Sequence, residues 1–220
     1  PAGGIGKRMQ AGKPKQYLNI KNESILSLTV NLISSINQVH EIILVCPKGD
    51  IETVKQIVGK NEKVKDIVEG GKNRQDSVKN GFVKLSNDIE YVLIHDSVRP
   101  FVDRACLNQL LKASIKYDGV ILGTPSVNTV KLVDENNIVK KTLDRRVVYQ
   151  IQTPQILKKD ILEDCYKKDN FSDVFTDEAM LVEKYGYTVK IIQGNTENIK
   201  ITDPQDLEMA GRIYESRNWF

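Results

Sequence analysis

Short apolar runs alternate along this chain with longer segments of helical periodicity, and this alternation restricts the possible folds most. Apolar runs occur at 41–46, 91–94 and 120–122, and prolines follow the first and the last of them. Because these runs lack polar alternation, they are typical of strands buried on both faces. Strands that alternate with helices predict an α/β fold with a Rossmann-like, doubly wound, mostly parallel sheet.

The segment 127–148 departs from that alternation. Two stretches of mixed polarity, 127–133 and 138–143, flank the polar turn 134–137, a pattern that predicts a β-hairpin. The hairpin has too few apolar residues to bury both faces, and a two-stranded ribbon is marginally stable alone. We therefore expect one domain over 1–220 with a projecting arm that packs on a second subunit. An exposed, unpaired hairpin is the alternative.

Composition excludes several classes of protein. A net charge of +3 is too small for a general nucleic-acid binder, and no apolar run has transmembrane length. The cysteines Cys46, Cys106 and Cys165 are widely spaced and include no Cys-x-x-Cys pair. A zinc site or disulfide framework is therefore not expected, and a cytoplasmic location fits. We also expect a strand ahead of Pro1, because phosphate loops in α/β folds follow buried strands.

The first seventeen residues have the composition of a phosphate-binding loop. Three glycines can expose backbone N–H groups, and four cations accompany them: Gly3, Gly4, Gly6, Lys7, Arg8, Lys13 and Lys15. Neither Gly-Lys pair is followed by Ser or Thr, which excludes a P-loop, and Met9 replaces the third glycine of the dinucleotide fingerprint. A flexible surface loop is the alternative.

Three further stretches follow or form predicted strands, where open α/β sheets bind ligands. In residues 70–77 the glycines could face a flat base, with Ser77 near its edge, although a plain strand–helix turn is also possible. In residues 95–100, Asp96 could hold a ribose hydroxyl or a metal ion, whereas His95 fits a structural role better than a catalytic one. Lys200 stands inside the predicted apolar strand 198–202, either reaching solvent or aimed into a site.

The candidate residues favour phosphoryl or nucleotidyl transfer. No catalytic triad is visible, because neither histidine lies near a candidate nucleophile in the sequence. Lysine and arginine side chains are abundant instead, and in phosphoryl transfer positioning and charge stabilisation provide most of the catalysis.

Six motifs, in order over nearly the whole chain, carry a resemblance to a known family. The sequence resembles the 2-C-methyl-D-erythritol 4-phosphate cytidylyltransferase family, within the sugar-phosphate nucleotidyltransferases, in segments 2–17, 70–78, 95–100, 152–155, 176–179 and 198–202. The resemblance implies an enzyme of non-mevalonate isoprenoid synthesis that joins CTP and methylerythritol phosphate and releases pyrophosphate. It also implies a homodimer, in which the 127–148 arm of one subunit reaches the site of the other.

The resemblance also implies roles for individual residues. Arg8 and Lys15 would stabilise charge on the transition state, and Arg145 and Lys200 would clamp the polyol phosphate. Asp96 would lie by the ribose and phosphates, near a Mg²⁺ ion held largely by CTP. The remaining implied substrate- and nucleotide-binding residues are Ala2, Gly3, Gly4, Gly6, Gly71, Arg74, Ser77, Arg99, Thr129, Thr153 and Thr176.

One departure and two rival functions accompany the resemblance. The family often has Asp where this chain has Asn128, which removes a charge near the proposed substrate end. The closest rival is a ribitol-5-phosphate cytidylyltransferase, although the segment 176–179 resembles the methylerythritol enzymes more. The second rival is a non-catalytic nucleotide-binding protein, against which stands the presence of Arg8, Lys15, Arg145 and Lys200 together.

Overall fold

A mixed four-stranded sheet forms the centre of the computed structural model, which describes residues 1–4, 9, 12–171 and 173–217. The strand order is β10 (Val189–Gln193), β6 (Gly119–Pro125), β9 (Tyr149–Lys158) and β5 (Tyr91–Ile94). β10 runs parallel to β6, whereas β9 is antiparallel to both β6 and β5. The α/β class is confirmed, and the sheet is mixed because the chain returns from the hairpin arm directly into β9.

The long strand β9 was not expected, because its Gln152–Gln155 stretch has the polar, proline-containing character of a loop. Its pairing with β6 moves from Ile121↔Gln155 to Leu122↔Gln152, so that Thr153 and Pro154 form a bulge. Pro154 has no N–H to give to a sheet, and a bulge is where a strand tolerates it. The peptide bond between Thr153 and Pro154 is cis.

A second, separate pair of strands is parallel, β3 (Ile42–Cys46) with β4 (Val64–Glu69). The start of the chain connects this pair to the segment after β5: the Ala2 N–H donates to Val45 O over 2.6 Å, and the Ser97 N–H donates to Pro1 O over 3.3 Å. A largely apolar cavity of about 490 Å³ lies in the same region, and its lining includes residues of β3, β5, α1 (Ile25–Ser34) and α3 (Arg74–Phe82).

The helices lie close to the expected positions. They are α1 (Ile25–Ser34), α2 (Ile51–Val58), α3 (Arg74–Phe82), α4 (Arg104–Ser114), α5 (Lys159–Lys168), α6 (Glu178–Lys184) and α7 (Pro204–Ser216). Asp103 and Asp203 cap α4 and α7, because their side chains accept backbone N–H groups at the starts of these helices. The cap of α6 is Asp177 and not the preceding Thr176. Within the described ranges, no helix has both the length and the apolar character needed to cross a membrane.

Residues 198–202 were expected to form a strand, and this expectation is wrong. They belong to a loop that is anchored to the segment after β5, because the Ile201 N–H donates to Val98 O over 3.0 Å and the Ile201 side chain is fully buried. Side-chain hydrogen bonds add to these two anchors, since the buried Asn198 amide donates to Thr153 O over 2.9 Å, and they take the place of a ladder. It nevertheless brings Lys200 to the end of β5.

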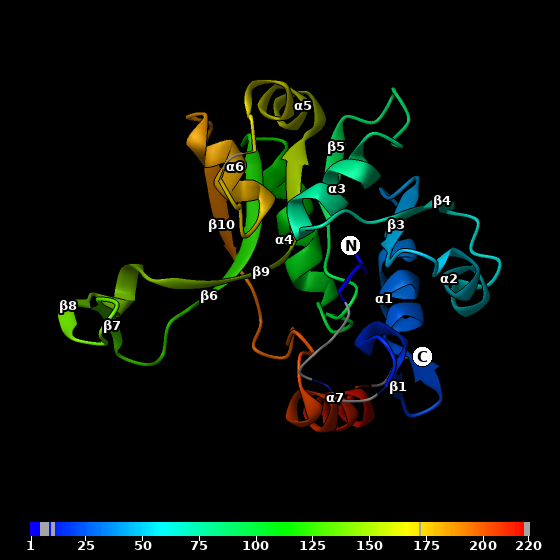
Figure 1. Cartoon of the computed structure of the whole chain (residues 1–220), viewed down its shortest axis with the longest axis horizontal. Coiled ribbons are helices and arrows are strands. Elements are labelled where there is room, and N and C mark those ends of the chain that lie inside the picture. Colours follow the sequence, from blue (N-terminus) through cyan, green and yellow to red (C-terminus); the bar gives the residue numbers. More distant parts are fainter. Residues whose placement is uncertain (5–8, 10–11, 172, 218–220) are drawn as a thin grey trace.

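The expected hairpin is confirmed as β7 (Val130–Val133) paired with β8 (Val139–Leu143). It projects away from the body of the molecule in Figure 1. Most apolar side chains of the arm are exposed, among them Val127, Leu132, Ile138 and Val147.

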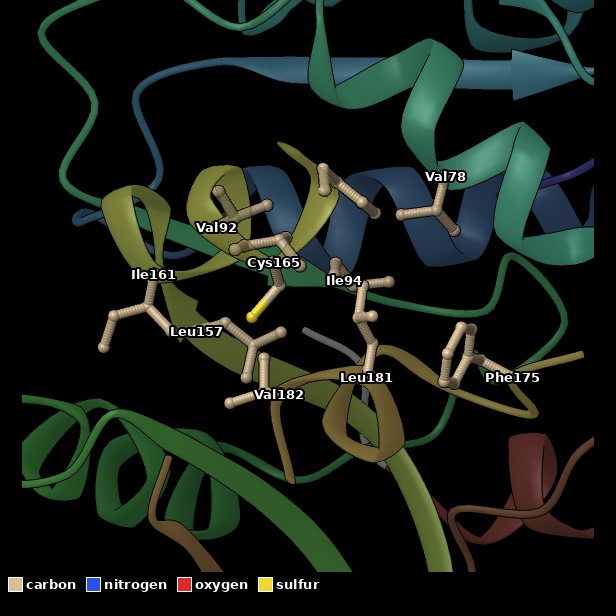
Figure 2. Close-up of a cluster of buried hydrophobic side chains, with 11 residues drawn as sticks. Val78, Val92, Ile94, Leu157, Ile161, Cys165, Phe175, Leu181 and Val182 are labelled. Atoms are coloured by element: carbon tan, nitrogen blue, oxygen red, sulfur yellow. The ribbon is translucent and has the colours of Figure 1, made fainter. Parts of the chain in front are cut away.

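The core beneath the site joins elements that are distant in sequence. Figure 2 shows side chains from α3, β5, β9, α5 and α6 converging on Leu157 and Cys165, both of which are fully buried. Phe175, in the segment before α6, packs in the same cluster. This packing holds the start of α6 beside the start of α3 and the end of β5, where the polar site lies.

Candidate active site

Asp96 follows β5 directly and is the centre of the charged cluster. Only 7% of the residue is exposed, and three cations approach its carboxylate. Lys200 Nζ lies 2.8 Å from Oδ2, Arg99 Nε lies 3.5 Å from Oδ2, and Arg74 Nε lies 3.8 Å from Oδ1. Burial raises the pKa of Asp96, but the charges of Lys200 and Arg74 outweigh it and hold that pKa well below its ordinary value. Asp96 is therefore a carboxylate at neutral pH.

Arg74, at the start of α3, connects Asp96 to a second buried carboxylate. Its Nη1 lies 2.9 and 2.7 Å from the two oxygens of Glu178, a residue that is 3% exposed. Burial lowers the pKa of Arg74, while Glu178 and Asp96 raise it by more, so the guanidinium stays charged. The buried Nη2 atom has no hydrogen-bond partner among the described residues. This cation is thus fixed in place with one donor group left unused.

Arg99 is held from behind by the loop that carries Lys200. Its Nη1 donates to Asn198 O over 2.8 Å, while Nε, buried and facing Asp96, makes no hydrogen bond within the described chain. Because the same loop presents Lys200, one segment positions two of the three cations around Asp96.

A chain of three hydrogen bonds fixes the backbone around Asp96. The Asp96 N–H donates to Thr153 Oγ1 over 3.0 Å, the Thr153 hydroxyl lies 3.0 Å from His95 Nδ1, and His95 Nε2 lies 2.9 Å from Arg99 O. A carbonyl only accepts, so we assign the proton to Nε2, and Nδ1 accepts from Thr153. Burial lowers the pKa of His95 to about 4, which keeps the ring neutral. This geometry agrees with the structural role expected for His95.

These residues line a polar cavity of about 210 Å³. Its walls hold three cationic and two anionic side chains, together with two hydroxyls and two amides. The lining residues are Arg74, Asp96, Arg99, Ile151, Gln152, Thr153, Gln155, Thr176, Asp177 and Lys200. A small ligand that carries both a phosphate and hydroxyl groups matches this donor and acceptor set.

The opening loop meets the turn before α3 close to the polar cavity, because the Ser97 N–H, next to Asp96, donates to Pro1 O over 3.3 Å. A Cβ atom on Gly3 would lie 3.6 Å from Ser77 Oγ, so these two residues are in contact distance. Ser77 Oγ accepts the Gly71 N–H over 3.1 Å and donates to Asn73 O over 2.9 Å. A Cβ on Gly71 would approach the Asp76 Cβ to 2.3 Å, which explains the glycine there. The two predicted nucleotide segments are therefore adjacent.

The structure brings together most of the predicted site residues, but not all of them. Six line the polar cavity, namely Arg74, Asp96, Arg99, Thr153, Thr176 and Lys200. Ala2, Gly3, Gly71 and Ser77 belong to the adjacent pair of segments, and Gly4 is exposed beside them. Lys15 begins a 3-10 helix, Lys15–Tyr17, and its charge contributes to lowering the pKa of Asp206. Gly6 and Arg8 lie outside the described residues.

Thr129 and Arg145 lie on the arm and do not line the cavity of their own chain. Arg145 is exposed, and its Nη1 donates to Val127 O over 2.9 Å. Neither residue is therefore placed to contact a substrate bound in the polar cavity of its own chain.

Five residues at the site were not predicted: Ile151, Gln152, Gln155 and Asp177, which line the cavity, and Glu178, which pairs with Arg74. In the sequence, Asp177 and Glu178 show only as negative charges that suit the start of a helix. Glu178 meets Arg74 across 104 positions of sequence, and a pairing at that distance leaves no local pattern. Gln155 lies in the segment 152–155, whose polar residues and proline give no strand pattern.

No group of three or more His, Cys, Asp or Glu side chains that could hold a metal ion occurs among the residues that the structure describes. Asp96 is a potential ligand for Mg²⁺, although cations already surround it. The protein groups present thus suit only a metal ion that takes most of its ligands from phosphate oxygens and water.

Comparisons with known proteins show the family to which this chain is similar. Residues 1–216 match the model of the family described as 2-C-methyl-D-erythritol 4-phosphate cytidylyltransferase. An enzyme of that name from Alkaliphilus metalliredigens is 39% identical over 98% of this chain and 91% of its own length. One from Clostridium botulinum (strain 657 / Type Ba4) is 40% identical over 97% and 95%.

Solved structures show the same likeness. The crystal structure of 4-diphosphocytidyl-2C-methyl-D-erythritol synthase from Anaerococcus prevotii superposes with a TM-score of 0.85 at 33% identity, covering 98% of this chain and 93% of that one. The 2-C-methyl-D-erythritol 4-phosphate cytidylyltransferase of Francisella tularensis gives a TM-score of 0.81 at 29% identity, covering 97% and 96%.

Proposed function

Because the chain belongs to the 2-C-methyl-D-erythritol 4-phosphate cytidylyltransferase family, we propose that its polar cavity binds the polyol phosphate while the opening loop holds CTP. The enzyme joins CTP and 2-C-methyl-D-erythritol 4-phosphate in isoprenoid biosynthesis. The observation that carries the placement of the polyol phosphate is the approach of Lys200, Arg99 and Arg74 to Asp96 at the end of β5.

In the proposed reaction, a phosphate oxygen of the polyol phosphate attacks the α-phosphorus of CTP. The new P–O bond forms as the bond to the bridging oxygen breaks, and the electron pair leaves with pyrophosphate. Lys200 and the two arginines would fix the attacking phosphate, and Asp96 would hold these cations in place. Lys15, with Arg8 from outside the described residues, would stabilise the charge that develops on the transferring phosphoryl group.

A divalent cation, Mg²⁺, is part of the proposal. When bound, such an ion neutralises charge on the triphosphate and orients it for in-line attack. Asp96 is the side chain that would contact it, and the remaining ligands would be phosphate oxygens and water. The chain's own contribution is to keep that carboxylate ionised and fixed through Thr153 and its cationic neighbours.

We also propose a cytoplasmic homodimer in which each arm completes the site of the partner subunit. Two observations support this. Exposed apolar residues gather on the arm, with Val127 and Val147 at 77% and 78% exposure. In addition, the cations of the cavity are largely neutralised, because Glu178 pairs with Arg74 and Asp96 with Lys200. A phosphate dianion therefore needs a further cation, and Arg145 of a second copy would supply it.

The substrate proposal is tested by measuring pyrophosphate release with each of the four nucleoside triphosphates and either methylerythritol phosphate or ribitol 5-phosphate. We expect turnover with CTP and the methylerythritol ester. Preference for the ribitol ester would overturn the choice of acceptor, and CTP binding without any turnover would identify a non-catalytic protein.

A further inference from the structure

Gln155 carries an unused acceptor in the wall of the polar cavity. The residue lies on β9, is fully buried, and lines the cavity. Its Nε2 donates to Asp177 Oδ2 over 3.0 Å, whereas its buried Oε1 has no partner among the described residues. Leaving a buried carbonyl oxygen without a donor is unfavourable, so such an atom in a cavity wall indicates a missing ligand or water.

The orientation of the Gln155 amide is set by Asp177. Asp177 caps α6, since its Oδ1 accepts the Met180 N–H over 2.9 Å. Its Oδ2 atom is therefore fixed in position and, as part of a carboxylate, can only accept. The amide must turn its NH₂ group towards Asp177, which leaves Oε1 as the acceptor that faces away.

We propose that Gln155 Oε1 accepts a hydrogen bond from a hydroxyl group of the polyol phosphate and is a specificity-determining residue of this enzyme. The inference rests on the proposed function of the cavity. The cations Lys200, Arg99 and Arg74 are donors that suit a phosphate, so they cannot recognise the hydrogen of a hydroxyl. A buried acceptor beside them can, and sites of this kind discriminate strongly against ligands that lack the hydroxyl.

Two substitutions test this role in different ways. Gln155→Met keeps the length of the side chain and removes the acceptor. Asp177→Asn keeps a capping oxygen for Met180 but presents an NH₂ group to Gln155, whose amide then turns over and points its own NH₂ into the cavity. Both variants replace the acceptor, although Asp177→Asn leaves Gln155 itself intact.

Asp103→Asn is the matched control. Asp103 also caps a helix, α4, through one oxygen, and accepts the Asn195 side-chain amide with the other. It does not line the polar cavity. The same chemical change is thus made at a helix cap where no ligand is proposed.

The measurements are kcat and KM for CTP and for 2-C-methyl-D-erythritol 4-phosphate, thermal unfolding, and turnover of the monodeoxy analogues of the polyol phosphate. We expect Gln155→Met and Asp177→Asn to raise KM for the polyol phosphate about 10- to 100-fold, the effect of leaving one buried polar group unpaired. KM for CTP should stay constant in both, and Asp103→Asn should change neither KM. Wild-type enzyme should turn over one monodeoxy analogue much less efficiently than the natural polyol phosphate. Gln155→Met should turn over that analogue and the natural substrate with similar efficiency.

Several outcomes would overturn the inference. If the two cavity variants lower only the unfolding temperature, or weaken CTP and the polyol phosphate equally, the role of Gln155 is structural. If wild type and Gln155→Met rank all the analogues alike, a water satisfies Oε1. A wild-type enzyme inactive with this substrate would overturn the proposed function as well, whereas unchanged variants of an active enzyme would overturn the role of Gln155 alone.

Discussion

The polar cavity and the projecting arm hold two halves of the proposed site in opposite physical states. In the cavity, Asp96 is 7% exposed, and two of its cationic partners, Arg74 and Arg99, are fixed by further contacts. On the arm, Thr129 and Arg145 are exposed, and Arg145 donates a hydrogen bond to Val127 O of the same arm. One half is preorganised by the fold, whereas the other, in the dimer that we propose, would be ordered against the partner subunit.

This difference separates two sources of catalytic geometry. Side chains packed in a core do not need to be ordered when substrate binds, so their interactions can act fully on the transition state. Exposed side chains on a two-stranded arm lose conformational entropy when they are ordered. In a dimer, the exposed apolar side chains of the arm would be buried at the subunit interface, and this burial would offset the loss of entropy before substrate binds. Cavity substitutions should thus act within one chain, and arm substitutions should act between chains.

The largest effect is expected from Asp96→Asn. Removing the carboxylate leaves Lys200, Arg99 and Arg74 near one another without their shared anion. We expect turnover to fall about 100- to 1000-fold and the free energy of unfolding to fall by about 3 kcal/mol. KM for the polyol phosphate should rise little, because the cations remain. Steady-state kinetics and urea unfolding measure both quantities, and turnover within fivefold of wild type would contradict the central place of Asp96.

The second effect is a pH dependence of stability that originates at His95, which contacts the cavity wall through the Thr153 hydroxyl. Burial lowers the pKa of His95 to about 4 from an ordinary value of 6.5. Between these values the unfolded chain binds a proton that the folded chain does not, so stability falls as the pH is lowered. The slope is about 1.4 kcal/mol per pH unit, which gives a loss of about 3 kcal/mol over the window. His95→Gln should flatten this slope.

Urea unfolding at several values between pH 7 and pH 4 measures the slope. His40→Gln, at an exposed histidine, is the control and should keep the wild-type slope. A His95→Gln variant that retains the full acid-side loss would show that other groups cause it.

The sequence predicted the residues that line the polar cavity better than it predicted the contacts that hold those residues in place. Asp96 and Arg99 were found because the buried run before them has an unambiguous pattern. Lys200 was placed in the site although its segment is a loop rather than a strand, since the resemblance depends on motif order and not on secondary structure. β9 was missed because its bulge contains Thr153 and Pro154, and the Arg74–Glu178 pair joins two helix starts that have no sequence signal in common.

The third effect concerns the arm. Arg145→Ala should lower turnover about 100-fold, the usual cost of one lost charge contact in a transition state, without lowering the unfolding temperature of the body. Arg146→Ala is the matched control, because Arg146 is an exposed arm residue paired with Asp144 of its own chain. It should keep wild-type turnover.

Mixing two inactive variants distinguishes action within a chain from action between chains. If each site takes Lys200 from one chain and Arg145 from the other, a heterodimer of Lys200→Ala with Arg145→Ala has two different sites. One site carries both substitutions, and the other carries neither. Random exchange of subunits should then restore about one quarter of the wild-type activity, because half of the dimers are mixed and each has one intact site. No recovery after exchange would place Arg145 in the site of its own chain, or outside the site altogether.

The smallest effect is expected from Asn128→Asp, which adds to the arm the charge that related sequences often have there. Asn128 is exposed and its backbone carbonyl accepts the Ser126 hydroxyl over 3.1 Å, so the change should leave the fold unaltered. A carboxylate accepts a hydrogen bond from a polyol hydroxyl about twice as strongly as an amide does, and KM for the polyol phosphate should fall about threefold. Asn136→Asp in the hairpin turn adds the same charge farther along the arm and should leave KM unchanged. If both substitutions shift KM equally, only the overall charge of the arm matters; if Asn128→Asp raises KM, then position 128 faces the phosphate rather than the hydroxyl end of the substrate.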